Sequence, residues 1–377
     1  MKFVLAAYGS RGDTEPCIAV AEELQRRGHD VVTAMTVPPE MRAYVESKGL
    51  AVQPYGRHWQ ELLGDEDFTR MLRDPLGAIP QAVEYVAQVG AEKTATLTSL
   101  AAGANLLVAG MTEQETAANV AEHQRIPLAA LHFFPSEILP SRPSPDQPQR
   151  REPSPLGSLE IQAYDEICVP DLAASWAGSA GRRPFVGALT LQLPADADAD
   201  VLSWISSGAP PVYFGFGSMP VPGPKDMVTV IGAACARLDV RALICLGPNY
   251  FDDTPDNDRV KVVRDVNHSA VFPACRAIVH HGGAGTTAAV LRAGVPALVL
   301  WNGLDQPVWA ASVAHLETGF GRRFLESTLD SLVADLHAIL EPRYAVRARE
   351  VAELVTAPAE SLRRAADLLE DAAMLGC

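Results

Sequence analysis

The residues best suited to chemistry in this sequence gather in one short stretch, His280-His281-Gly282-Gly283-Ala284-Gly285-Thr286-Thr287. Glycines let the backbone approach a ligand closely, and the first N–H groups of a following helix have no partners within it. Oriented donors at the positive end of a helix dipole suit a phosphate or diphosphate. The stretch is therefore predicted to bind an anion, and a tight turn without a ligand is the alternative.

The two histidines are sequence neighbours at the end of an apolar run. If the strand continues through them, their side chains point to opposite faces. We expect His281 to face the ligand, with a structural role as the alternative, while His280 packs or pairs elsewhere. A zinc site is not predicted, because no third converging ligand is visible nearby.

A carboxylate forms the second candidate centre. Asp13 ends the turn Gly9-Ser10-Arg11-Gly12-Asp13, which lies between a predicted strand and a predicted helix. Two roles fit that position about equally, a helix cap and a general base. Because an ordinary carboxylate is a weak base at neutral pH, catalysis would require its partial burial or a late proton transfer.

The acidic pattern Asp196-Ala197-Asp198-Ala199-Asp200 is a weaker candidate for holding a divalent metal. It lies in an Ala- and Asp-rich stretch that reads as a linker, and Asp200 is placed to cap the helix that follows. No metal site is therefore predicted there.

Strand, turn and helix must alternate to position these residues. Apolar runs predict strands at 2–7, 31–35, 106–109, 128–131, 212–216, 241–246, 260–263, 277–279 and 297–300. The first helix is expected to have Thr14 as its cap and Pro16 in its first turn, and the helix after the glycine stretch is expected to end at Gly294. This alternation predicts an α/β protein with two Rossmann-like halves.

Domain boundaries follow from breaks in that pattern. Residues 1–193 and 194–377 are the predicted domains, joined by a linker at 193–200, and the last helix is a candidate to pack back on the first domain. The proline-rich segment 135–155 is predicted to be a surface loop or flap.

Composition narrows the class of protein. The net charge of −15 argues against nucleic acid as a partner, and the six cysteines show no CxxC pair. With no membrane-spanning apolar stretch, a reduced, soluble, cytoplasmic protein is expected, with at most peripheral membrane contact. The chain lacks G-x-G-x-x-G in its first turn, GxxxxGK[ST] and GxSxG, which disfavours nicotinamide or flavin enzymes, P-loop NTPases and α/β-hydrolases.

Four segments together carry a family resemblance: 9–16, Gly215-Phe216-Gly217-Ser218, 280–287 and Asp305-Gln306-Pro307. They resemble the family 1 bacterial glycosyltransferases that decorate glycopeptide antibiotics, and also the sterol glucosyltransferases. Including 183–187 and 212–217, the chain is most similar to mycobacterial glycosyltransferases of the glycopeptidolipid type. The resemblance implies the GT-B fold, with two Rossmann-like domains facing across a cleft, the first binding the acceptor and the second the donor.

The same resemblance implies a role for each matching residue. Asp13 corresponds to the base that deprotonates the acceptor hydroxyl, and His281 to the histidine that contacts the donor diphosphate. Asp305 and Gln306 correspond to the pair that reads the sugar hydroxyls. The other expected donor-binding residues are Ser10, Arg11, Ser218, Val266, Gly283, Ala284, Gly285 and Thr286.

These implications define an inverting glycosyltransferase that needs no metal or cofactor and uses a UDP- or dTDP-sugar. Its acceptor would be a hydroxyl of a hydrophobic or amphipathic natural product, sterol or lipopeptide. One departure concerns the acceptor side, because the family normally has more helical residues between Phe134 and Leu159 than this proline-rich segment supplies. A non-catalytic GT-B protein that binds nucleotide sugars is therefore the alternative, and a nucleotide-sugar epimerase a weaker one.

Overall fold

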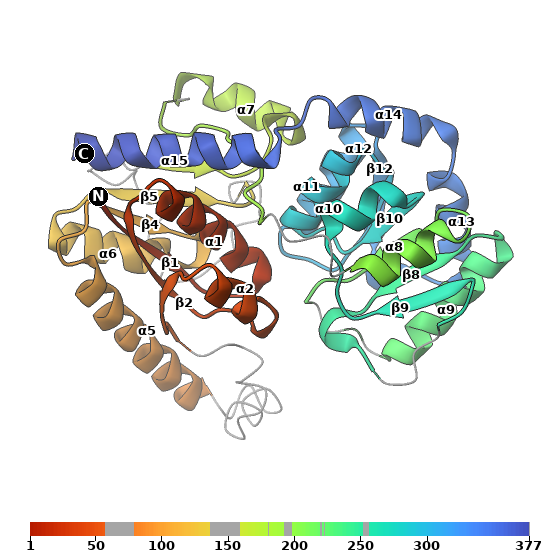
Figure 1. Cartoon of the computed structure of the whole chain (residues 1–377), viewed down its shortest axis with the longest axis horizontal. Helices are drawn as coiled ribbons and strands as arrows, with labels where there is room; N and C mark the ends of the chain where they lie inside the picture. The colour runs from red at the N-terminus through yellow and green to blue at the C-terminus, as the bar shows by residue number, and fades with distance from the viewer. Residues whose placement is uncertain are drawn as a thin grey trace.

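Two parallel β-sheets, each flanked by helices, form the two halves of the protein (Figure 1). This computed structural model describes residues 1–56, 79–135, 159–179, 181–191, 198–218, 221, 223–251 and 256–376. The predicted α/β class is confirmed. Among the described residues, no helix combines the length and apolar character needed to cross a membrane.

The first sheet has the strand order β3-β2-β1-β4-β5-β6. Its strands are β1 (Lys2–Ala7), β2 (Asp30–Met35), β3 (Ala51–Gln53), β4 (Leu106–Ala109), β5 (Leu128–His132) and β6 (Leu159–Gln162). All adjacent pairs are parallel. Nearly continuous apolar runs suit these strands, because helices cover both faces of a parallel sheet.

The second sheet has the order β12-β11-β10-β7-β8-β9. Its strands are β7 (Val212–Gly215), β8 (Ala242–Cys245), β9 (Val260–Val263), β10 (Ala277–His280), β11 (Ala297–Trp301) and β12 (Gly319–Arg323). Counted from its own first strand, this is the same order as in the first sheet. Each sheet therefore has a topological switch point, between β1 and β4 in one half and between β7 and β10 in the other, where ligands bind in open α/β sheets.

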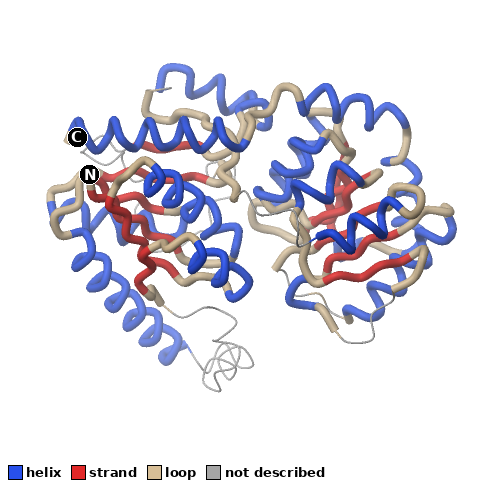
Figure 2. The backbone as a smooth tube through the Cα atoms, viewed as in Figure 1, coloured by secondary structure: helices blue, strands red, loops and turns tan. Residues whose placement is uncertain are grey.

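Helices of the first half pack on both faces of its sheet (Figure 2). They are α1 (Arg11–Arg26), α2 (Arg42–Ser47), α5 (Ile79–Ala101) and α6 (Gln114–Gln124), whereas α7 (Pro170–Trp176) lies outside these layers. Alternate residues of β1 serve the two layers: Phe3 and Leu5 join the core with α1, whereas Val4 and Ala6 join the core with α5 and α6. The period of two along the strand thus produces two cores.

The second half repeats this layering. Its helices are α8 (Ala199–Ser206), α9 (Pro224–Arg237), α10 (His268–Val271), α11 (Ala284–Ala293), α12 (Gln306–His315), α13 (Leu329–Ile339) and α14 (Pro342–Ala352). On β10, Val279 packs with α9 and α13, and Ile278 packs with α8, α11 and α12. Gly294 ends α11 with φ of 66°, as its sequence position predicts.

The last helix, α15 (Pro358–Leu375), crosses to the first half and lies along α1 (Figure 1). Its Ala365, Ala366 and Leu369 are fully buried in the same core as β1 and α1. Arg27 donates from one guanidinium nitrogen to Asp367 and Glu370 of α15, at 2.8 and 2.9 Å. The core of the first half is therefore built from both ends of the chain.

Two predicted helix starts are wrong. Helix α1 begins at Arg11 with Ser10 as its N-cap, so Thr14 lies inside the helix and Pro16 lies beyond its first turn. The start moves forward because the Asp13 carboxylate already satisfies the backbone N–H of Ser10. Helix α8 is preceded by Asp198, not Asp200, at the N-cap position.

Two other expectations concern residues outside the described part of the chain. The proline-rich segment falls almost entirely within 136–158, and the expected linker falls mostly within 192–197. Asp196 of the acidic pattern is among the latter. Asp198 is described, and its carboxylate accepts the backbone N–H of Asn267 at 3.0 Å, which ties the start of α8 to the loop after β9.

Candidate active site

A cleft of about 1440 Å³ lies between the two halves and collects every residue proposed from the sequence. Those lining residues are Ser10, Arg11, Asp13, Ser218, Val266, His281, Gly283, Ala284, Gly285, Thr286, Asp305 and Gln306. Each of them follows a strand, so the carboxyl edges of the two sheets open into one space. Their location in one cleft is established, and the chemical role of each stays a prediction.

Asp13, on the first half, is a partly buried carboxylate held by its own helix start. Its Oδ2 atom accepts the backbone N–H of Ser10 at 2.7 Å and the hydroxyl of Ser10 at 2.9 Å. Burial raises the pKa of Asp13, and the two hydrogen bonds from Ser10 oppose that rise. The group is thus a stronger base than an exposed aspartate.

Gly9 makes room for that carboxylate. It has φ of 137°, and a Cβ atom at this position would lie 2.3 Å from Oδ2 of Asp13. Both the backbone conformation and the close approach therefore require glycine here. The turn recognised in the sequence is shaped around the carboxylate.

Helix α11, on the second half, starts with unsatisfied donors. Gly283 is its N-cap and provides no side-chain cap, and the first turn contains no acidic residue. Thr287 is 1% exposed and returns both its hydroxyl and its backbone N–H to the carbonyl of Gly283, at 2.9 Å each. Thr287 is therefore structural, and the free donors at this end are the backbone N–H groups of the first turn.

The ring of His281 lies between two glycines at the mouth of that turn. A Cβ atom on Gly283 would come within 2.5 Å of its Nε2 atom, and one on Gly217 within 2.6 Å of its Cε1 atom. Burial lowers the pKa of His281 to about 4, with a partial opposing effect from the Gly215 backbone. The imidazole is therefore neutral at physiological pH.

His280 points into the protein, as the alternation of strand side chains predicts. It is fully buried, and its Nδ1 atom accepts the backbone N–H of Gly282 at 3.1 Å. Burial lowers the pKa of His280 well below its usual value, so the ring is neutral. Its role is to fix the turn in which Gly282 adopts φ of 90°.

Asp305 and Gln306 begin α12 on the far side of the cleft from Asp13. Oδ2 of Asp305 accepts the indole N–H of Trp309 at 2.9 Å, and Oε1 of Gln306 accepts the backbone N–H of Asn302 at 2.8 Å. Burial raises the pKa of Asp305, the bond from Trp309 opposes it, and the charge of Asp13 raises it further. The two carboxylates are therefore close enough to interact across the cleft.

Arg11 reaches toward the second half from the start of α1. Its Nε atom donates to Glu15 at 2.7 Å. Its charge also acts on the opposite wall, where burial first and Arg11 second lower the pKa of His268 to about 3. A cation at this position suits an anionic donor.

Several cleft residues were missed from the sequence. His268 lines the cleft beside Val266 and stacks on Phe272, with ring centroids 4.3 Å apart. Leu304 lines it next to Asp305, is 80% exposed and has φ of 57°. The rule that site residues follow strands would have found both. Nothing in their residue types pointed to a ligand.

The first half contributes the apolar part of the cleft wall. Those residues follow β2, β4 and β5 or lead toward the second half: Pro39, Met111, Phe133, Phe134 and Leu191. No cluster of three or more His, Cys, Asp or Glu side chains suited to a metal occurs in the part of the chain that the structure describes. On the first half, these apolar side chains and the Asp13 carboxylate line the same cleft.

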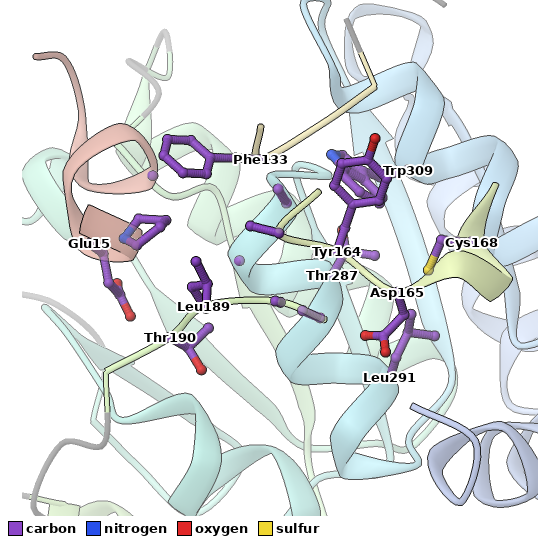
Figure 3. Close-up of a pocket in the computed structure, with 17 residues that line it drawn as sticks. Glu15, Phe133, Tyr164, Asp165, Cys168, Leu189, Thr190, Thr287, Leu291 and Trp309 are labelled. Atoms are coloured by element: carbon purple, nitrogen blue, oxygen red, sulfur yellow. The ribbon is translucent and has the colours of Figure 1, made fainter. Parts of the chain in front are cut away.

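A small cavity of about 40 Å³ lies behind the cleft, where α1 and α11 approach each other (Figure 3). Glu15 of α1, Thr190 of the segment between the halves and Thr287 of α11 border it. Phe133, Tyr164 and Trp309 also border it, as Figure 3 shows. Residues of both halves therefore meet directly at this seam.

Comparisons with known proteins agree with this geometry. Residues 3–136 match the Glycosyltransferase family 28 N-terminal domain, and residues 231–366 match the Erythromycin biosynthesis protein CIII-like, C-terminal domain. An uncharacterized glycosyltransferase of Mycobacterium tuberculosis is 52% identical to this chain, with 99% of each chain covered. The chain belongs to the glycosyltransferase family.

A named relative of this glycosyltransferase is the vancomycin aglycone glucosyltransferase of Amycolatopsis orientalis. It is 30% identical, and the match covers 99% of this chain and 98% of that one. The alignment with the mycobacterial relative extends over 416 positions, more than the 377 residues present here. That relative therefore has residues that this glycosyltransferase lacks.

Solved structures resemble this glycosyltransferase over its whole length. The glycosyltransferase of kitacinnamycin has a TM-score of 0.69 at 19% identity, covering 98% of both chains. The calicheamicin glycosyltransferase CalG4 has a TM-score of 0.68 at 18% identity, again covering 98% of both. VinC, solved in complex with dTDP, has a TM-score of 0.61 at 19% identity and covers 99% of both. The GT-B fold expected from the resemblance is confirmed.

Proposed function

We propose that this glycosyltransferase is inverting and metal-independent, and moves a sugar from a UDP- or dTDP-sugar to a hydroxyl of a hydrophobic or amphipathic small molecule. One observation carries the proposal. A partly buried carboxylate on one half and an uncapped helix start beside a neutral histidine on the other line the same cleft. That is the charge arrangement needed for attack by an alcohol and departure of a diphosphate.

Asp13 is the proposed base. Its Oδ2 atom is occupied by Ser10, so Oδ1 is left to accept the proton of the acceptor hydroxyl. The reaction passes through an oxocarbenium-like state, which builds positive charge on the sugar before the new bond is complete. The proton can therefore leave late, and a carboxylate with a raised pKa suffices.

The diphosphate is the proposed leaving group at α11. Negative charge grows on it as the glycosidic bond breaks, and the first-turn amides of α11 are already oriented toward that charge. His281 becomes a better donor as the charge develops, because an adjacent anion raises an imidazole pKa. Helix dipole, amides and histidine together supply what a metal would otherwise provide.

The positions of these groups support the proposal of inversion. The base acts from the first half and the leaving group is held by the second, which suits a single displacement with attack opposite to departure. Asp305 and Gln306 lie at the start of α12, beside the diphosphate helix, and are proposed to hold the sugar hydroxyls. The apolar wall with Met111 and Phe134 is proposed to receive the acceptor.

A mass-spectrometric screen tests the proposal directly. The purified protein is incubated with a panel of UDP- and dTDP-sugars and a mixed library of hydrophobic acceptors, with and without EDTA. We expect an acceptor mass increased by one sugar, unchanged yield with EDTA, and inverted anomeric configuration by NMR. Retention of configuration or an absolute need for a divalent metal would contradict the mechanism. Tight nucleotide binding with no transfer to any acceptor would favour the non-catalytic alternative.

A further inference from the structure

We infer that Arg292 is a positioning residue that keeps the base helix α1 and the donor helix α11 in working register. It acts through the two segments where the chain passes between the halves. The first passage is residues 188–191, and the second is residues 353–357, which leads from α14 to α15. The inference rests on the proposed function, in which Asp13 and α11 act from opposite sides of the cleft.

Arg292 lies in the last turn of α11 and donates to both passages. One terminal nitrogen donates to Oγ1 of Thr190 at 2.9 Å, and the other to the carbonyl of Ala188 at 2.6 Å. Its Nε atom donates to the carbonyl of Thr356 at 3.0 Å, and Ser361 of α15 accepts a fourth bond at 3.2 Å. The planar fork of an arginine suits several acceptors at fixed angles, which a lysine cannot match.

The first passage is also held from the side of the base. Glu15 follows Asp13 by two residues on α1, and its Oε1 atom accepts the backbone N–H of Leu191 at 3.1 Å. Figure 3 shows Glu15 and Thr190 bordering the same small cavity. A continuous series of contacts therefore runs from α1 through Glu15 and the first passage to Arg292 and α11.

The second passage is packed tightly against the first. Asp165 accepts the backbone N–H of Thr356 at 2.7 Å. Gly187 has φ of 81°, and a Cβ atom there would lie 2.5 Å from Cβ of Thr356. Burial lowers the pKa of Arg292, and the Asp165 carboxylate opposes that effect. The guanidinium lies at the point where both passages meet.

Because Arg292 lies far from the first turn of α11, its loss should affect the rate of sugar transfer and not the affinity for the nucleotide. The first turn of α11 and Arg292 are eight residues apart, about 12 Å along a rigid helix. Most proposed donor contacts lie in the second half, so a loosened junction leaves them intact. It does change where Asp13 lies relative to the bound donor, and a misplacement of about 1 Å can cost about a hundredfold in rate.

Arg241 offers a matched control. Its guanidinium donates to four backbone carbonyls, those of Asp258, Ile205, Ala209 and Trp204, at 2.8, 3.0, 3.1 and 2.6 Å. All four acceptors belong to the second half, so this arginine bridges no junction. Arg241→Lys removes the same kind of bonding network as Arg292→Lys without touching either passage.

The experiment compares these two variants with the wild type. Affinity for UDP and dTDP is measured by calorimetry, transfer by kcat and KM, and stability by Tm. For Arg292→Lys we expect nucleotide Kd within about twofold of wild type, a kcat lowered by about tenfold or more, and a Tm change similar to that of Arg241→Lys. Arg241→Lys should keep kcat within about twofold.

Two results would overturn the inference: equal losses of kcat in both lysine variants, or a nucleotide affinity that falls in Arg292→Lys as much as kcat/KM does. If Arg292→Lys folds poorly, Thr190→Val removes one acceptor of the same network at constant volume and should lower kcat while leaving nucleotide Kd unchanged. An unaltered kcat in Thr190→Val would then contradict the inference.

Hydrogen exchange separates this inference from the proposed function. The amides of Leu191 and Thr356 are held by Glu15 and Asp165 at the junction, and Arg292→Lys should speed their exchange. Arg241→Lys should leave them protected. If the wild type transfers no sugar but this exchange pattern appears, Arg292 still sets the register of the halves and the proposed function fails. Unchanged exchange at both amides would refute the positioning role itself.

Discussion

The two halves share one strand order, but the turns that lead into α1 and α11 differ in the charge at the start of the helix. Helix α1 carries an acidic residue three positions into its first turn, and Asp13 satisfies the backbone N–H of its own N-cap. Helix α11 has Gly283 as N-cap and no acid in its first turn, so its donors face the cleft. The same topology thus yields a helix start that carries a carboxylate on one half and a helix start with free backbone donors on the other, and the third helical residue differs between them.

Replacing the carboxylate at the start of α1 should give the largest effect. Asp13→Asn keeps the shape and the bonds from Ser10 but removes the base, so we expect transfer to fall by about a thousandfold. Nucleotide affinity should stay within about twofold, as measured by calorimetry. Undiminished turnover would remove Asp13 from the mechanism.

An aspartate placed at the matching position of α11 should give that helix start the negative charge that α1 has. Thr286 occupies in α11 the position that Asp13 occupies in α1, the third residue of the helix. Thr286→Asp would cap the helix internally and repel a diphosphate, so we expect UDP or dTDP to bind about a hundredfold more weakly. Thr286→Asn is the uncharged control, and equal affinity of the two variants would refute the anion site. The Tm of Thr286→Asp should not fall.

Removing the histidine should weaken anion binding at the start of α11. His281→Ala loses one donor to a charged group, and nucleotide affinity should fall by roughly tenfold to a hundredfold. His280→Ala is the comparison, since its ring fixes the turn from inside the protein. That variant should lower Tm more than His281→Ala does. Nucleotide affinity unchanged in His281→Ala would contradict contact with the diphosphate.

A substitution at Trp309 should weaken binding of the sugar without weakening binding of the nucleotide. Trp309→Phe keeps an aromatic side chain but removes the indole N–H that donates to Asp305. The pKa of Asp305, already raised by burial, should rise further. The KM for nucleotide sugar should rise by about threefold to tenfold, whereas Kd for the free nucleoside diphosphate should not change. Equal shifts in both constants would place Asp305 away from the sugar.

The smallest predicted effect concerns stability. The folded-state pKa of Asp13 is raised, so its contribution to stability is present below the unfolded pKa and is lost as pH rises through the folded value. Asp13→Asn should therefore raise Tm by about 1–2 °C at neutral pH and by nothing near pH 3. A lower Tm at neutral pH would show that the carboxylate stabilises the fold.

The sequence named the cleft residues largely through the family resemblance, and the strand pattern explains why they meet. Each follows an apolar strand, and the carboxyl ends of parallel strands meet at one edge of a sheet. It predicted the start of α1 poorly, because Thr14 and Pro16 are plausible opening residues and the reciprocal contacts of Ser10 with Asp13 override them. The contacts between Ser10 and Asp13 set the helix start more strongly than the local residue preferences of Thr14 and Pro16.

The side-chain contacts of the junction could not be predicted from the sequence, which indicated only that the last helix could pack back on the first domain. Arg292 contacts Ala188 and Thr356, which are 104 and 64 residues away along the chain. No periodicity or motif records such a pairing, since it depends on how two finished halves meet. The cleft residues belong to local sequence patterns and could be named from the sequence. The contacts of Arg292 belong to no such pattern and are seen only in the structure.

The return of α15 to the first half has a consequence for how the protein is made. Ribosomes deliver the N-terminal strands and α1 first, yet the face that covers them, with Ala366 and Leu369, is synthesised last. The apolar face of the first half that α15 covers therefore stays uncovered until the residues of the second half have been synthesised. A chain lacking α15 would thus keep the strands and helices of the second half but leave apolar residues of the first-half core exposed to solvent.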